Sequence, residues 1–177
     1  LGLLLPLGDA GAEPRRYRID PEHFSILFAA THIGYQDVLG MFLQGGGSFT
    51  YDETARRLSD LKVTIKAASA FTNHKDRDRH LRSKDFLWAD QHPDITFVMT
   101  RAEPTGERTG RITGDLTLRG VTKPISVDVT LNNNAYTIGI SARAVVERSR
   151  WGSTYAADVG WVPDEIPLRF ELEAIRE

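Results

Sequence analysis

Hydrophobic and polar residues alternate along most of the chain from residue 17 onward. Successive side chains of a strand point to opposite faces of a sheet, so this alternation is typical of strands with one buried and one solvated face. The alternating stretches are 24–32, 61–71, 95–99, 112–118, 125–131, 138–146 and 166–174. A further strand is predicted at 38–42, and it continues through Phe49 and Tyr51 after a glycine break at 45–47. The pattern predicts an all-β domain of about eight strands.

One interval, 72–92, departs from this pattern because it is rich in charge and lacks alternation. Small polar residues cap helices, and the residue before a proline is disfavoured in the helical region. We therefore expect a helical insertion near residues 73–91, with one or two short helices capped near Thr72 or Asn73 and at Ser83. The segment 120–124 predicts a hairpin between two of the strands.

Eight amphipathic antiparallel strands leave no unpaired edge when they close into a barrel. A barrel of this size encloses packed side chains or one ligand. A two-sheet sandwich would bury the same rows and is the alternative architecture. No linker, repeat or shift in composition divides the chain, which predicts a single domain over residues 13–177.

The first twelve residues form a separate signal. An apolar run at 1–7 is followed by small residues that end in Ala10-Gly11-Ala12. Such a run, too short to span a bilayer, is typical of a secretory signal peptide that ends in a cleavage site. We expect residues 1–12 to be the remnant of that peptide and the protein to act in the periplasm or outside the cell. An ordinary apolar N-terminal segment, able to plug a cavity or to support a homodimer, is the alternative.

Composition excludes several classes of function. The 22 Lys and Arg residues against 24 Asp and Glu give a net charge of −2, without the basic excess that nucleic-acid binders use to neutralise phosphates. The chain has no cysteine, which excludes disulfides, thiolate metal sites and cysteine nucleophiles. It also lacks G-x-S-x-G, phosphate-binding and dinucleotide-binding glycine motifs, so no cofactor is predicted, and the glycines at 45–47 are expected to form a turn.

One dense group of metal-ligand residues occurs within the charged interval. His74, Asp76, Asp78 and His80 form an H-x-D-x-D-x-H string, and either a helix or a strand would bring several of them to one face. Basic residues interleave with the string and can neutralise its carboxylates. We therefore favour an ion-paired helix over a metal site.

Three polar residues lie on the apolar side of their strands: His32, Ser69 and Arg148. His32 is either a hydrogen-bonded buried histidine or a polar contact for the head group of a ligand. An inward Arg148 requires a partner because an unpaired buried charge is costly, and its neighbour Glu147 should point the opposite way. His32 could also serve as general base in a hydrolase or isomerase that acts on an apolar substrate.

Several segments together carry a family resemblance. They are His23-x-x-Ile26-x-Phe28-x-x-x-His32-x-Gly34, Val38-x-Gly40-x-Phe42, Arg77-Asp78-x-His80-Leu81-x-Ser83-x-Asp85-Phe86, Pro93-x-Ile95-Thr96-Phe97, Gly114-x-Leu116-Thr117-Leu118-Arg119-Gly120-Val121-Thr122-Lys123-Pro124 and Arg148-Ser149-x-x-Gly152. In order and spacing the chain resembles the YceI family from about residue 17 to residue 176. It departs from that family at Phe24, where Ser or Thr is usual, and in its short connection at 132–136.

The resemblance implies a lipocalin-like antiparallel barrel with a helical insertion. It also implies export to the bacterial periplasm or secretion. The ligand implied is an elongated apolar molecule: a polyisoprenoid, an isoprenoid quinone or a fatty-acid-like chain.

The favoured function is that of a non-enzymatic lipid carrier or scavenger. The alternatives are a filled barrel that serves as a structural or interaction module, and the enzyme that would use His32. The residues expected to contact the ligand are Phe24, Ile26, Phe28, His32, Phe42, Val63, Ile65, Phe97, Met99, Leu116, Leu118, Val127, Val129, Ile140, Leu168 and Phe170.

Overall fold

The computed structural model describes residues 13–134 and 136–177. The predicted remnant of a signal peptide, residues 1–12, therefore lies outside the described residues, as does one residue of the short connection. The strands are β1 (Arg15–His32), β2 (Gln36–Phe42), β3 (Gly45–Asp52), β4 (Arg57–Lys66), β5 (Ala70–Phe71), β6 (Asp94–Pro104), β7 (Thr109–Leu118), β8 (Val121–Asn133), β9 (Thr137–Glu147) and β10 (Glu165–Arg176). The helices are α1 (Lys75–Arg82) and the short 3-10 turns η1 (Ala67–Ser69) and η2 (Arg148–Trp151).

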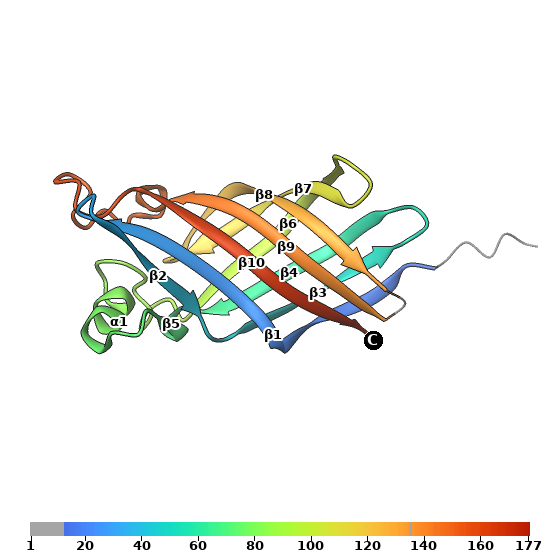
Figure 1. Ribbon diagram of the computed structural model, residues 1–177, viewed down its shortest axis with the longest axis horizontal. Helices are drawn as coiled ribbons and strands as arrows, with labels where there is room; N and C mark the ends of the chain where they lie inside the picture. The colour runs from blue at the N-terminus through green and yellow to red at the C-terminus, as the bar shows by residue number, and fades with distance from the viewer. Residues whose placement is uncertain (1–12, 135) are drawn as a thin grey trace, which may run out of the picture.

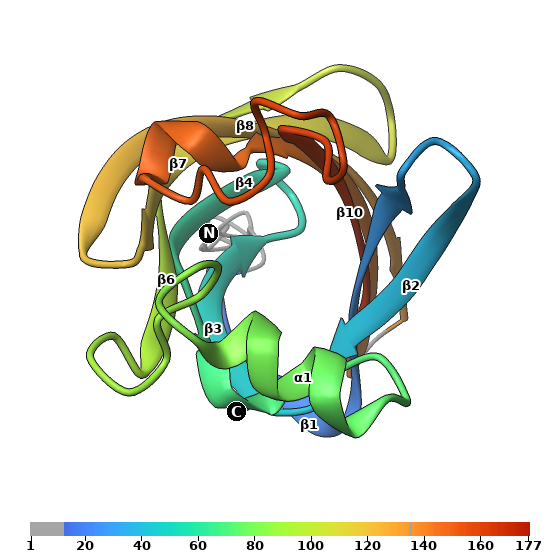
Figure 2. The same ribbon diagram turned by 90° about the vertical axis from the view of Figure 1, so that its left-hand side faces the viewer.

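Eight of these strands close into an antiparallel barrel. The sheet order is β10-β9-β8-β7-β6-β4-β3-β1, and β10 pairs back with β1 (Figures 1 and 2). This last pairing runs from Tyr17 opposite Arg176 to Phe28 opposite Leu168. It confirms the predicted barrel and rules out the sandwich.

Strands β2 and β5 extend the sheet at one end of the barrel. β1 is long enough to have two partners on one side: its start pairs with β3, and its last part, from Ile26, pairs with β2. The short β5 then pairs with β2 at Met41 and Phe42. The predicted strand at 61–71 is therefore interrupted, because β4 ends at Lys66 and the chain turns through η1 before β5.

The two ends of the barrel differ. At one end, called the loop end here, lie the turn between β1 and β2, the helix α1 and the connection 148–164 (Figures 1 and 2). At the opposite end the fully buried rings of Tyr17 and Phe49 stack with their centroids 5.4 Å apart. Ile138 and Ala174 pack with them as a separate buried cluster. This cluster fills the opposite end with side chains.

The insertion contains one α-helix, and its caps differ from those expected. The N-cap is His74, whose Nδ1 accepts the N–H of Arg77, rather than Thr72 or Asn73. Ser83 ends α1 instead of beginning a second helix, because its N–H and hydroxyl both donate to the carbonyl of His80. Residues after Ser83 form turns up to β6.

Two glycine predictions have different outcomes. The predicted hairpin joins β7 and β8, but its turn is formed by Arg119 and Gly120, which take φ values of 54° and 72°, and residues 121–124 belong to β8. Two residues at positive φ suit the right-handed twist of a tight hairpin. The predicted turn at 45–47 is wrong, because these glycines belong to β3 and pair with β4. An added Cβ on Gly47 would lie 2.3 Å from the carbonyl oxygen of Lys62, so the close approach of the two strands accounts for glycine there.

The connection 148–164 is folded around one buried arginine. The Arg148 side chain donates from Nε to the carbonyl of Pro163, from Nη1 to Ser153, and from Nη2 to both Tyr155 and Val162, at 2.8–2.9 Å. The inward Arg148 therefore has the partners that its burial demands, and they are carbonyl oxygens of the backbone. Burial lowers the pKa of its guanidinium, and the nearby charge of Asp164 opposes that shift.

We predict that Arg148→Met destabilises the protein by about 3 kcal/mol, because four carbonyls in buried or partly buried hydrogen bonds lose a charged donor. Urea unfolding followed by circular dichroism measures the free energy of unfolding. Arg143→Met, on the exposed side of β9, is the matched control and should change it by less than about 0.5 kcal/mol. Equal stability of the Arg148→Met and wild-type proteins would contradict this account of the connection.

Candidate functional site

An apolar cavity of about 230 Å³ lies inside the barrel. Inward side chains of all eight barrel strands line it, and β2, α1 and the connection 148–164 contribute at the loop end. Among the described residues that line the cavity, only Arg148 and Ser153 are polar. The interior is therefore suited to hydrocarbon rather than to a compact polar molecule.

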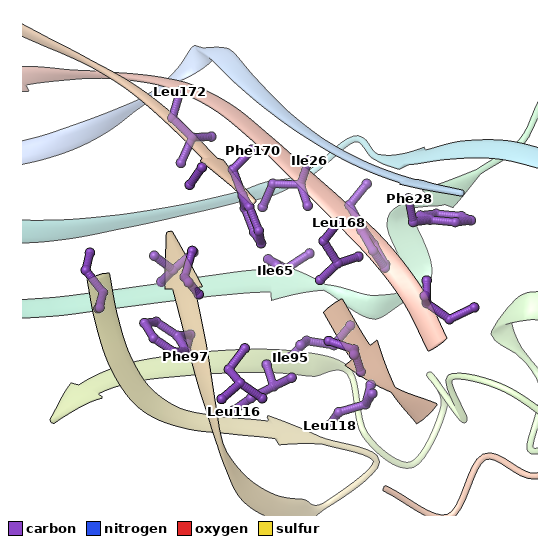
Figure 3. A pocket seen from close by; sticks show the side chains of 18 of the residues that line it. Ile26, Phe28, Ile65, Ile95, Phe97, Leu116, Leu118, Leu168, Phe170 and Leu172 are labelled. Carbon is purple, nitrogen blue, oxygen red and sulfur yellow. The ribbon is translucent and has the colours of Figure 1, made fainter. Parts of the chain in front are cut away.

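Thirteen of the sixteen residues predicted to contact a ligand lie on the wall of this cavity. Figure 3 shows several of them pointing into one space from different strands, among them Ile26, Phe97 and Leu168. That they contact a ligand stays a prediction. The thirteen are Ile26, Phe28, Phe42, Val63, Ile65, Phe97, Leu116, Leu118, Val127, Val129, Ile140, Leu168 and Phe170.

The other three predicted residues do not line the cavity. Phe24 and Met99 pack against the core from the side, and the pairing of β6 with β7 shifts register just after Met99. His32 is exposed, because β1 ends there, beyond the buried part of the barrel, and turns towards Gln36. His32 is therefore not a buried histidine, which corrects that interpretation, and it does not line the cavity. That it contacts the head group of a ligand or acts as a general base stays a prediction.

Sequence reasoning missed the lining residues contributed by the cover at the loop end. Leu81, Phe86 and Leu87 reach the cavity from the insertion, and Val162 reaches it from the connection before β10. The apolar run at 86–88 was visible in the sequence. Its inward direction was not, because no periodicity relates an irregular segment to the barrel axis.

Phenylalanine rings on the wall are packed against glycines. The Phe28 ring lies over Gly40, where an added Cβ would be 2.2 Å from its Cζ, and the Phe97 ring lies over Gly114 in the same way, at 2.4 Å. Phe24, which departs from the resembled family, occupies the space beside Gly45. Each ring therefore occupies the volume that a side chain at the glycine would take.

The insertion and the connection form one cover across the loop end. His80 of α1, Phe86 and Tyr155 make a cluster of rings with centroids 4.8–5.3 Å apart. Arg119 donates to the carbonyls of Phe86 and of Trp151, which ties the insertion to η2. Burial lowers the pKa of this guanidinium. The cover is thus held by rings and by two arginines bound to backbone carbonyls.

The four residues of the H-x-D-x-D-x-H string bind four different partners. His74 caps α1, Asp76 pairs with Arg79 at 2.9 Å, and His80 Nε2 lies 2.8 Å from Asp85. Buried Asp78 accepts both the N–H and the hydroxyl of Thr72, at 2.7 and 2.6 Å. Within 13–134 and 136–177, no three His, Asp or Glu residues are placed to hold a metal ion.

No helix in the described part of the chain is long and apolar enough to cross a membrane.

Solved structures share this architecture. BcnA of Burkholderia cenocepacia superposes with a TM-score of 0.79 at 24% identity, over 88% of this chain and 98% of that one. A YceI protein of Campylobacter jejuni is 32% identical, with a TM-score of 0.73 over 83% and 90% of the two chains. A polyisoprenoid binding domain from Saccharophagus degradans has a TM-score of 0.74 at 12% identity, over 93% and 100%.

Curated relatives agree with these structures. A UPF0312 protein of Pseudomonas syringae pv. tomato is 44% identical over 131 residues, which are 73% of this chain and 67% of that protein. A UPF0312 protein of Photorhabdus laumondii is 36% identical over 181 residues, covering 99% of this chain and 93% of its own. The model of the YceI-like domain matches residues 17–174. Together with the closed barrel and its helical insertion, this match shows that the chain belongs to the YceI-like family.

Proposed function

We propose that this protein binds one elongated apolar molecule along the barrel axis and carries or sequesters it. The observation that carries the proposal is the cavity itself, to which all eight strands contribute apolar side chains and in which only Arg148 and Ser153 are polar. The polyisoprenoid binding domain of Saccharophagus degradans, which has the same fold, supports this ligand class. Candidate ligands are a polyisoprenoid, an isoprenoid quinone or a fatty-acid-like chain.

The shape of the cavity favours a chain. Along β10 its lining runs from Ile166 to Leu172, roughly 20 Å of strand at about 3.3 Å per residue. Each buried methylene contributes about 0.8 kcal/mol, so affinity grows with the length of chain that the cavity encloses. A compact polar molecule would bind poorly, because it would lose its hydrogen bonds to water and only two polar side chains line the described cavity to replace them.

The two polar side chains also set a direction for the ligand. Both Arg148 and Ser153 lie at the loop end, whereas Phe49 and Leu131 line the cavity towards the opposite end. A guanidinium carries five N–H groups, and four of those of Arg148 donate to backbone carbonyls, which leaves one for a ligand. We therefore propose that the ligand binds with its apolar tail towards Phe49 and any polar terminus beside Arg148.

The proposed compartment is the periplasm or the space outside the cell. The apolar run at 1–7 and the small residues that follow it support export. Catalysis is not part of the proposal, because the histidine that would have acted as base lies outside the cavity.

We expect the natively purified protein to contain a stoichiometric apolar chain, seen by mass spectrometry of an organic-solvent extract and by native mass spectrometry of the complex. Phe97→Asp, which puts a charge on the cavity wall, should abolish retention. Val145→Asp, at an exposed position of β9, should leave it unchanged. A folded wild-type protein that stays empty after being offered polyprenols, quinones and fatty acids would favour the filled barrel instead.

A second expectation concerns the ring packed on glycine. Gly40→Ala should push the Phe28 ring into the cavity, because the three atoms nearest to the added Cβ all belong to that ring. Losing the space of about two methylenes corresponds to roughly a tenfold loss of affinity. Displacement of a fluorescent fatty acid measures it. Gly46→Ala, where nothing lies within 4 Å and φ is not positive, is the control, and equal affinities of the two variants would refute the role given to Phe28.

A further inference from the structure

Large apolar side chains are exposed on two neighbouring tips at the loop end. The turn between β1 and β2 exposes 84% of Tyr35 and 38% of Ile33, and the connection before β10 exposes 56% of Val159 and 54% of Trp161. These four residues are called the tip patch below. Single exposed apolar residues are ordinary, but a group of them at one end of a domain marks an interaction site.

The two tips are held together and project from the barrel. The N–H of Ile33 donates to the carbonyl of Trp161 at 3.1 Å, and Figure 1 shows both segments extending beyond the strands at the loop end. Ile33 and Ala156 take φ values of 52° and 54°. A β-branched residue rarely adopts this left-handed region, so the surrounding structure must hold Ile33 there. Arg148 supplies part of that structure by binding the carbonyl of Val162.

The tip patch lies close in sequence to residues of the cavity wall. Val162, which follows Trp161, lines the cavity, and so does Ala30, three residues before Ile33. The two tips therefore adjoin, along the chain, residues that line the loop end of the cavity. A partner that contacts the tip patch would lie beside the end of the cavity at which we place the polar terminus of the ligand.

The chemistry of the tips identifies the partner. Tyr and Trp combine an apolar ring with a polar group and are enriched where membranes meet water. The segments 31–37 and 152–163 contain no Lys or Arg, so attraction to an acidic partner is not available there. Of their two carboxylates, Asp37 accepts a hydrogen bond from the hydroxyl of Thr31, and Asp158 is exposed beside Val159. A surface of this kind binds by burying apolar side chains.

We propose that the tip patch inserts into the interfacial layer of a lipid bilayer and holds the loop end of the barrel against the membrane. The transfer of a ligand between bilayer and cavity that this contact would allow rests on the proposed function. The contact itself does not, because it depends only on the exposed side chains of the two tips.

The test is flotation of the full chain with vesicles of phosphatidylcholine, alone or mixed with phosphatidylglycerol. We expect binding to both compositions and little change between low and high salt, because burial of apolar surface is not screened. The double variant Tyr35→Ser/Trp161→Ser should bind at least about tenfold more weakly, since it loses two interfacial anchors. Residues 1–12 are the same in every variant, so their contribution cancels.

Two controls separate the tips from the rest of the surface. Tyr136→Ser, 66% exposed beside β9 at the opposite end, and Val145→Ser, 54% exposed on the barrel wall, should bind vesicles like the wild type. Brominated lipids should quench part of the tryptophan fluorescence, and Trp161→Phe should remove that part, because Trp151 is only 1% exposed and Trp88 is largely covered.

The proposal is overturned if the folded protein floats with neither vesicle, or if the double variant floats as well as the wild type. It is also overturned if vesicles do not bind and sedimentation shows that the tip patch joins two copies of the chain. Extraction of the same preparations separates the two proposals. Vesicle binding by a protein that stays empty after being offered polyprenols, quinones and fatty acids would sustain the membrane contact and refute the carrier.

Discussion

The pairing of β1 with β10 is the constraint on which the rest of the structure depends. It joins the first and last strands of the chain and leaves the barrel strands without a free edge. The inward side chains of each strand then face those of the other strands rather than water. The apolar cavity exists only because this ring of strands is complete. The length of β1 matters for the same reason, since it pairs with β3 near one end and with β2 near the other while remaining bound to β10.

The cover at the loop end follows a different physical rule. It has little regular structure, so its backbone carbonyls need donors that are not supplied by a sheet. Arg148 and Arg119 supply them from inside the fold, and each lies where burial lowers its pKa. Two charged side chains thus order a segment that hydrophobic packing alone would leave undetermined. The tip that carries Trp161 lies between two carbonyls, those of Tyr155 and Val162, that Arg148 binds.

The sequence predicted the barrel and most of its wall because both follow from period two. Every second residue of a strand points to the same face, so thirteen lining residues followed once the inner face of each strand was chosen correctly. The alternation predicted the wrong residues where a strand ended or where its pairing shifted register. His32 is on the same side of the alternation as the inward residues of β1 but lies at the last position of that strand. Met99 lies just before the irregularity in the pairing of β6 with β7.

The remaining errors have one cause in common. The conformational freedom of glycine alone suggests a turn at 45–47. Gly47 instead lies within β3, where the close approach of β4 leaves no room for a side chain. Similarly, Ser83 has the composition of an N-cap, but its hydroxyl is used by the preceding turn of α1. The first outcome depends on strand β4, which lies beside Gly47, and the second on the carbonyl of His80, which precedes Ser83. The residue types at these positions do not reveal either contact.

The cavity has an energetic consequence that links the fold to the proposed function. An empty apolar space of about 230 Å³ weakens a fold by on the order of 5 kcal/mol, at about 24 cal/mol per Å³. Larger side chains opposite Phe28 and Phe97 could fill part of it, yet Gly40 and Gly114 stand there and the rings lean onto them. A chain bound along the axis would restore the missing contacts, so the ligand would complete the core of the protein as well as be carried by it.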